Sequence, residues 1–265
     1  DGMVRIPQQQ EGLLAGEEVA VELWRSQDAI DRSVVCCGSH DLTLDLLGDL
    51  FSRRHPGFSL SSAPVGSTAG LMALRRGEAH LAGIHLLDEE SGEYNIPFLA
   101  RFLPGVPVSL VTLVEREQGL MVLPGNPKKI YSVEDLSRQD VAFINRQRGA
   151  GTRLLLEAWL KEKNIPPEAI SGYDREEYTH LAVAAAVAAG SADTGLGVFA
   201  AARAMGLDFI PLAKERYDLA IPVARLAEDG VIRLLEVVRS EEFHQAVVSM
   251  GGYHVDRTGQ LIYRA

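Results

Sequence analysis

The sequence predicts an α/β fold in which strands and helices alternate. Short apolar runs typical of buried strands recur along the chain, and segments with helical spacing separate them. Glycines and prolines stand at the boundaries between these segments, where the chain has to turn. Such alternation favours largely parallel sheets, because parallel neighbours need a crossover and a helix usually provides it. The alternation begins at Ser33 and continues to the end of the chain.

The individual elements follow from apolar spacing and turn residues. Between residues 42 and 54, large apolar side chains recur at the spacing of an amphipathic helix, and a Pro-Gly pair follows it. Strands are expected at residues 33–37, 58–63, 79–85, 108–114, 120–123, 141–144, 192–198, 209–212 and 218–221. Helices are expected at residues 42–54, 71–76, 154–160, 181–189 and 229–250, with a short helix from Ser132 and another ending at Met205.

Residues 1–24 form a separate unit with two expected strands, at residues 3–7 and 19–23. Two strands cannot bury a core by themselves, so this unit is expected to belong to a sheet whose other strands lie elsewhere. Residues 25–32 are polar and without pattern, and they are interpreted as a linker. The chain starts at Asp1 and not at methionine, and we expect it to be part of a longer protein.

Composition and charge exclude some classes of partner. The chain has 265 residues and a net charge of -10, which argues against binding to nucleic acid or to an anionic membrane. A local site for a small anion is still compatible with this charge. No apolar run approaches the roughly 18 residues of a membrane span, and no secretory signal is present. The adjacent Cys36 and Cys37 are expected to be free thiols in a reducing compartment, and the expected location is cytoplasmic.

The most informative stretch lies between an apolar strand and an apolar helix. A strand that turns at glycines and restarts as a helix presents unpaired backbone N–H groups, which favour an anion. Hydroxyl and guanidinium groups in the same stretch would add hydrogen bonds to that anion, and the arginines would decide which anion binds. The candidate ligand-binding residues here are Asn145, Arg148, Gly149, Ala150, Gly151, Thr152 and Arg153. The alternative interpretation is an ordinary loop with surface arginines.

Further candidates stand where other strands end, because ligands of open α/β sheets bind beyond the carboxyl ends of the strands. These candidates are Ser39, His40, Ser67, Thr68, His85, Thr179 and Tyr217. For the hydroxyl residues the alternative is helix capping, and for the histidines it is a structural or surface role. Asp41 is expected to cap a helix, and Asp193 is expected to hold a hinge or an arginine.

The order of elements from Ser33 to the C-terminus resembles the type II periplasmic-binding-protein fold. Four stretches carry this resemblance: residues 65–71, 77–85, 145–153 and 189–195. More narrowly, the chain looks like the PBP-like domain that is fused to molybdenum cofactor proteins and to some transcription regulators. The resemblance implies two α/β lobes with ligand between them. Lobe 1 would comprise residues 33–113 and 215–265, and lobe 2 residues 114–214.

A second resemblance covers the N-terminal unit. Residues 1–7, 11–13 and 15–21 resemble the end of the C-terminal β-domain of the MoeA/gephyrin family, which inserts molybdenum into molybdopterin. This implies MoeA-type catalytic domains upstream, with a homodimer formed through that part as one possible assembly.

These observations predict a binding domain that has no catalytic residues, no metal site and no covalently bound cofactor. Metalloprotease, Walker and nucleophile-elbow motifs are absent from the sequence. The expected ligand is molybdate, tungstate or a similar small anion. The alternative is an effector-binding module for an organic carboxylate, a phosphate or a pterin-related metabolite. A third hypothesis, an enzyme lobe, would need His40, His85 and Asp193 to pair within hydrogen-bond distance.

Overall fold

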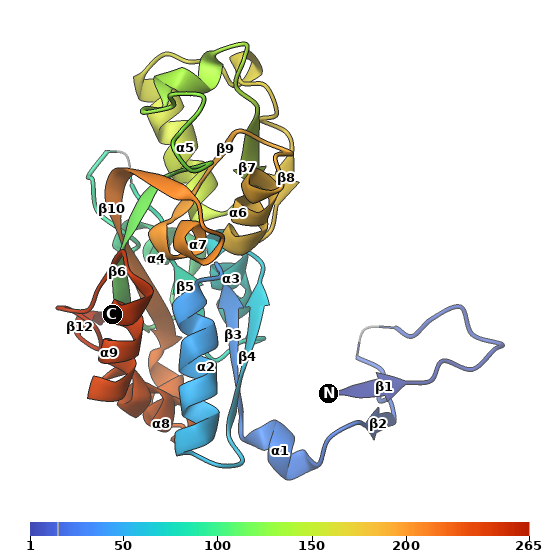
Figure 1. Ribbon diagram of the computed structural model, residues 1–265. Helices are drawn as coiled ribbons and strands as arrows, with labels where there is room; N and C mark the ends of the chain where they lie inside the picture. Colours follow the sequence, from blue (N-terminus) through green and yellow to red (C-terminus); the bar gives the residue numbers. More distant parts are fainter. Residues whose placement is uncertain (15, 89, 265) are drawn as a thin grey trace.

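Two α/β lobes joined by two long strands form the body of the protein (Figure 1). The computed structural model describes residues 1–14, 16–88 and 90–264. The joining strands are β6 (Val108–Val122) and β10 (Asp208–Pro222), which pair antiparallel along almost their whole length. The predicted two-lobed α/β fold is confirmed.

The prediction that β6 and β10 are each two separate strands was wrong. Each is one strand of 15 residues. The predicted strands stopped short of the polar residues in the middle of each strand, but Arg116, Gln118 and Glu215 are almost completely buried, and Arg116 and Gln118 both donate to Glu215. Buried polar groups keep such partners, so polarity here marks a buried network and not a surface turn.

Lobe 1 occupies the lower part of Figure 1, with α2, α8 and α9 around the strands. Its strands are β3 (Ser33–Gly38), β4 (Ser59–Pro64), β5 (Ala82–Ile84), β11 (Tyr253–His254) and β12 (Leu261–Arg264). Its helices are α2 (Leu42–Arg54), α3 (Ser67–Arg75), α4 (Ile96–Phe102), η3 (Val223–Arg225), α8 (Asp229–Val238) and α9 (Glu241–Met250). The single helix predicted at 229–250 is therefore two helices, because Ser240 caps the second by accepting a hydrogen bond from the Phe243 N–H.

Lobe 2 occupies the upper part of the same view. Its strands are β7 (Phe143–Arg146), β8 (Glu176–Glu177) and β9 (Thr194–Val198). Its helices are η1 (Glu134–Ser137), α5 (Gly151–Glu162), η2 (Pro167–Ala169), α6 (His180–Ala188) and α7 (Phe199–Ala204). The pairs β3–β4, β7–β8 and β7–β9 are parallel, whereas every pair made by β6 or β10 is antiparallel. The sheets are thus mixed, because the joining strands run in opposite directions between the lobes.

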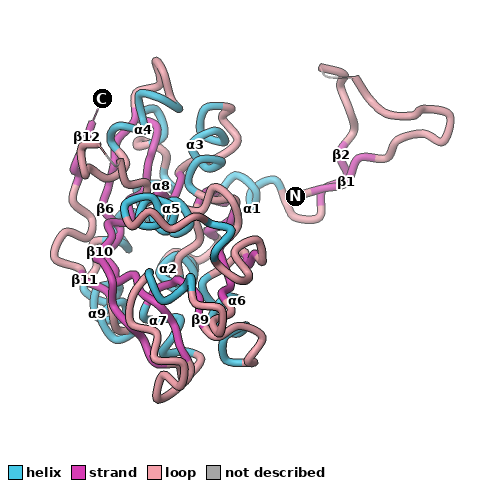
Figure 2. The backbone as a smooth tube through the Cα atoms, turned by 90° about the horizontal axis from the view of Figure 1, so that it is seen from above, coloured by secondary structure: helices cyan, strands magenta, loops and turns pink. Residues whose placement is uncertain are grey.

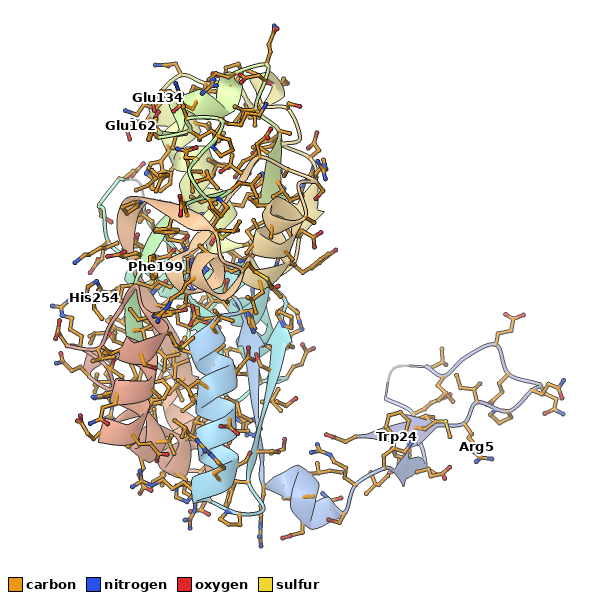
Figure 3. The ribbon with its side chains drawn as sticks, in the orientation of Figure 1. Arg5, Trp24, Glu134, Glu162, Phe199 and His254 are labelled. Carbon is orange, nitrogen blue, oxygen red and sulfur yellow. The ribbon has the colours of Figure 1, made fainter. Side chains whose placement is uncertain are left out.

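The N-terminal unit extends away from the two lobes in both views (Figures 1 and 2). Two strands, β1 (Gly2–Val4) and β2 (Val21–Leu23), lie in this unit near the predicted positions; they pair antiparallel with each other, and in the described residues no further strand joins their sheet. The predicted linker contains a short helix, α1 (Gln27–Asp31), whose first turn is capped by Ser26. Figure 3 shows Arg5 and Trp24 on the extended unit, and Trp24 is 71% exposed. The hairpin therefore leaves apolar side chains uncovered.

The two cysteines and the lack of a membrane-spanning segment are the remaining features that the sequence predicted. Cys36 and Cys37 are both free, and burial raises the pKa of the Cys36 thiol to about 12, so this sulfur stays protonated and inert. Within the described residues, no helix is long and apolar enough to cross a membrane.

Candidate functional site

Several strand ends and helix starts meet where the two lobes face each other. The loop before α3 in lobe 1 lies against the loop before α5 in lobe 2: a Cβ atom added at Gly66 would lie 2.9 Å from the Gly149 carbonyl oxygen. A Cβ atom added at Gly151 would lie 2.5 Å from the ring of His85, which follows β5. Only glycine allows this approach, so the lobes are in close contact along this line.

A buried network of charged and polar side chains, which we call the hinge cluster, crosses this junction. The hinge cluster consists of Asp41, His85, Arg116, Gln118 and Glu215. Arg116 Nε and Nη2 lie 2.9 and 2.8 Å from Glu215 Oε2, and Nη1 donates to Asp41. Arg116 thus joins a carboxylate at the start of α2 to one in the middle of β10.

The environment keeps both carboxylates of the hinge cluster ionised. Burial alone would raise the pKa of Glu215, but His85, Arg116 and the hydrogen bonds from His85 and Gln118 outweigh it and lower that pKa to about 2. Burial likewise opposes ionisation of Asp41, but Arg116 and hydrogen bonds from Thr43 lower the pKa of this carboxyl. Burial also opposes the charge of Arg116, but Glu215 and Asp41 outweigh it and hold the pKa of Arg116 above its usual value.

His85 stands between a serine and a glutamate. Its Nε2 lies 2.7 Å from Ser39 Oγ, and its Nδ1 is hydrogen-bonded to Glu215. Burial lowers the pKa of His85, and the neighbouring Glu215 offsets this only in part. Tyr217 fixes the arrangement, because its ring stacks on the His85 ring and its hydroxyl donates to the Ser39 carbonyl oxygen. Ser67 Oγ accepts a hydrogen bond of 3.3 Å from the His85 N–H.

Arg146, at the end of β7, carries a buried positive charge that forms no direct ion pair with a carboxylate among the described residues. Its Nε donates to Gln147 Oε1 and its Nη2 to the Tyr178 carbonyl oxygen, whereas the buried Nη1 has no partner. Burial and the charge of Arg116 lower the pKa of Arg146 to about 10, so it stays charged at neutral pH. A buried unpaired charge is costly, which makes this group a strong candidate for an anion contact.

Other buried groups at the junction also lack partners. Both ring nitrogens of His180 and the Oε1 of Gln118 are buried without a hydrogen bond. Helices α3 and α5 have no side-chain cap at their starts, although Ser67, Gly151 and Thr152 are buried there. Buried helix starts need an acceptor for their N–H groups, and the positive end of the helix dipole favours an anion.

Comparison with known proteins agrees with this architecture. A family model described as "PBP superfamily domain" matches residues 48–239. The chain belongs to this family. Its relatives include the protein YvgK of Bacillus subtilis (strain 168), which is 34% identical over 235 residues, 87% of this chain and 74% of that protein. A Clostridium pasteurianum protein, "in ferredoxin 2Fe-2S gene 5'region", is 37% identical over 114 residues, covering 41% of this chain and 97% of its own.

Solved structures share the fold of this PBP superfamily domain. A putative phosphate ABC transporter substrate-binding protein with bound phosphate, from Clostridium perfringens, matches 82% of this chain and 97% of its own with a TM-score of 0.61 and 14% identity. A tungstate ABC transporter structure from Geobacter sulfurreducens matches 83% and 99% with a TM-score of 0.60 and 13% identity. At these identities the likeness shows the fold alone.

The PBP superfamily domain brings many of the predicted site residues to the junction between its lobes. Those at the junction are Ser39, Ser67, Thr68, His85, Gly149, Ala150, Gly151, Thr152 and Tyr217. Thr152 Oγ1 lies 3.4 Å from Gln118 Nε2, which ties α5 to the hinge cluster.

Other predicted residues serve structural roles in the domain. Arg148 is exposed and lies 3.7 Å from Glu176. Arg153 pairs with Glu157 and Glu176, and its guanidinium lies over the Tyr173 ring. The expectation that these two arginines select the anion therefore finds no support in their placement, because acidic neighbours already occupy both.

The remaining predicted contacts are also used within their own lobes. Asn145 Nδ2 donates to the Tyr173 carbonyl oxygen, and Thr179 caps α6 by accepting from the Ala182 N–H. His40 bonds Asp45 at 2.9 Å, and Asp193 accepts from the Ala142 N–H and not from an arginine. The pairing of His40, His85 and Asp193 that an enzyme lobe would need is therefore not formed.

Sequence reasoning missed five buried polar or charged residues at the junction. These are Arg116, Gln118, Arg146, His180 and Glu215. Arg116 and Gln118 are separated by Glu117 alone, which places both side chains on one face of β6. Because Glu115 and Glu117 flank Arg116, the local sequence carries no signal that this face of the strand is buried.

Proposed function

We propose that this domain captures a small anion between its two lobes and is itself not an enzyme. The observation that carries the proposal is Arg146, a buried guanidinium with an unpartnered Nη1 and no carboxylate neighbour among the described residues. Arg116 is paired directly with Asp41 and Glu215, which leaves Arg146 as the guanidinium with a donor free for an anion.

In this proposal, closure of the lobes completes the site. The uncapped starts of α3 and α5 come from different lobes, and they approach each other at Gly66 and Gly149. An anion between them would accept hydrogen bonds from both helices and thus hold the lobes together, as hinge closure around a ligand does in general. The close approach of the two glycine loops favours an anion of inorganic size over a pterin-sized ligand.

We further propose molybdate or tungstate as the anion, in the cytoplasm and in a chain with MoeA-type domains upstream. Support comes from the resemblance of residues 1–21 to a MoeA-type β-domain and from the β1–β2 hairpin, which exposes Trp24 and has no core of its own. The structural likeness to proteins described with phosphate and tungstate makes these anions the first to test.

Calorimetric titration with molybdate, tungstate, sulfate and phosphate tests the proposal, using Arg146→Gln and the matched control Arg148→Gln. A hydrogen bond to a charged group contributes about 1.5–3 kcal/mol, so Arg146→Gln should weaken binding by about 10- to 100-fold. Arg148 is exposed and lies two residues away, so its variant should bind like the wild type. Failure of all four anions to bind would refute anion capture, and equal losses in both variants would refute the role of Arg146.

Stability distinguishes a binding role of Arg146 from a structural one. Because its charge is buried and has no direct ion pair, replacing it with glutamine should leave the melting temperature unchanged or raise it in the absence of anion. A lower melting temperature would show that Arg146 stabilises the fold itself.

A further inference from the structure

The positions of the hydrogen-bonding protons at the junction limit which anions the site can bind. This inference rests on the proposed anion capture. The carboxylate of Glu215 is ionised and can only accept, so the His85 nitrogen that contacts it, Nδ1, carries the proton. In a neutral imidazole the other nitrogen, Nε2, is then an acceptor. Ser39 Oγ, at 2.7 Å, must donate its single proton to it.

With its proton on His85, Ser39 presents only lone pairs to the junction. Gln118 also presents an acceptor. Its Nε2 donates to Glu215 at 2.5 Å, so its Oε1 lies on the other side of the amide, where it is buried and has no partner. The junction therefore combines donors, on Arg146 and on the starts of α3 and α5, with two acceptor oxygens. A bare oxyanion, which can only accept, would be repelled by both acceptors.

Charge balance at the junction leads to the same conclusion. Arg116 and Arg146 contribute two positive charges, and Asp41 and Glu215 contribute two negative charges, so the four groups are together neutral. A bound dianion would leave two uncompensated negative charges in a buried space, which is unfavourable. One additional proton in the cluster would halve this excess.

His85 is the group placed to take that proton, and several elements face its side chain. Glu215 and Tyr217 of β10 contact the ring, and Ser39 after β3 bonds Nε2. Four further elements face the ring or its backbone: α5 through Gly151, α3 through Ser67, and β6 and β7 through the charges of Arg116 and Arg146. Of these groups only Glu215 favours a charged imidazole. A bound anion would be a second negative group that favours it.

We propose that the junction binds its anion together with one proton, with Ser39 and His85 as the residues that determine this specificity. For a bare oxyanion the proton comes from solvent and is taken up by His85 Nε2. Nε2 then donates to Ser39 Oγ, and the Ser39 hydroxyl turns its own proton toward the anion. An oxyanion that carries a hydroxyl group, such as hydrogen phosphate, brings the proton itself and donates it to Ser39 or Gln118.

Calorimetry in buffers of different ionisation enthalpy counts the protons taken up by the wild-type protein. At about pH 8, sulfate and molybdate should each bind with close to one proton taken up, and their affinity should fall about tenfold per pH unit above neutrality. Hydrogen phosphate already carries a donor for Ser39 or Gln118, so it should bind with less proton uptake than sulfate or molybdate and with a flatter pH profile. Binding of the bare anions without proton uptake would overturn this inference while leaving anion capture intact. Absence of any anion binding would overturn both.

Two histidine variants assign the proton. His85→Gln should abolish proton uptake and flatten the pH profile for sulfate and molybdate. The matched control is His244→Gln on α9, whose ring bonds the Val238 carbonyl oxygen far from the junction, and it should retain the uptake. Uptake that persists in a folded His85→Gln protein would refute the role of His85.

Discussion

Replacing Arg116 with methionine tests how the hinge cluster is stabilised. The guanidinium contacts both buried carboxylates: Nε donates to Glu215 Oε2, Nη2 lies 2.8 Å from the same oxygen as an ion pair, and Nη1 donates to Asp41. Methionine fills a similar length but leaves two buried carboxylates without their cation. Removing one partner of a buried ion pair costs about 3–5 kcal/mol, against a total stability of about 5–15 kcal/mol for a typical domain. A protein of this size should then melt roughly 6–20 °C lower.

The pH dependence of this loss has a definite sign. In the wild type the lowered pKa of Glu215 gives a stability contribution that is present above the unfolded value of about 4.3 and is lost toward about pH 2. In Arg116→Met the buried carboxyls lose their main cation, so their pKa values should rise. A raised carboxyl pKa favours the folded state at low pH, so the stability gap to the wild type should narrow from about pH 8 to about pH 5.

Guanidinium unfolding followed by circular dichroism at both pH values measures this gap. Arg76→Met serves as the control, because Arg76 forms a comparable pair with Glu78 that is exposed to solvent, and it should change stability little. A loss below about 1 kcal/mol in Arg116→Met, or a gap that widens on acidification, would refute the reasoning.

Two further substitutions test the junction and the start of α6. In Gly151→Ala the new Cβ would meet the His85 ring and the His85 carbonyl oxygen at 2.5 Å, so the lobes should stay apart. We expect anion affinity to fall by at least about tenfold. Small-angle scattering should show a larger radius of gyration than for the wild type in the presence of anion. Unchanged affinity would show that this contact is not needed for closure. Thr179→Ala removes the cap on the Ala182 N–H and should cost about 1 kcal/mol in thermal unfolding while anion affinity stays near that of the wild type. A large loss of affinity would instead show that the Thr179 hydroxyl contacts the ligand.

The parts of the fold that depend on local signals were predictable from the sequence. Helix α2 has the predicted bounds, because its cap at Asp41, its apolar spacing and the Pro-Gly turn after it are all local. The joining strands were not predictable in this way, because their polar centres are buried only through pairing between residues about 100 positions apart, such as Arg116 with Glu215. Local pattern cannot show that such residues meet.

The candidate site illustrates the same limit at the scale of one loop. The sequence located the turn before α5 and its glycines, but it could not rank the arginines on either side. Arg146 ends a buried strand and is 1% exposed, whereas Arg148 stands two residues later on an exposed turn. The difference depends on which way the chain leaves β7, and this is set by contacts with lobe 1.

The two joining strands also have a consequence for the order in which the protein can fold. The chain leaves lobe 1 along β6 and returns along β10, so residues 123–207 form one continuous insertion. The core of lobe 1 unites Val34 and Phe51 with Leu219 and Phe243, which are synthesised last. During translation the inserted lobe can complete its core while lobe 1 still lacks β10, α8 and α9. We therefore expect lobe 2 to fold before lobe 1. Until α9 emerges, the apolar faces of α2 and β3 have no packing partner, and we expect chaperones to protect them.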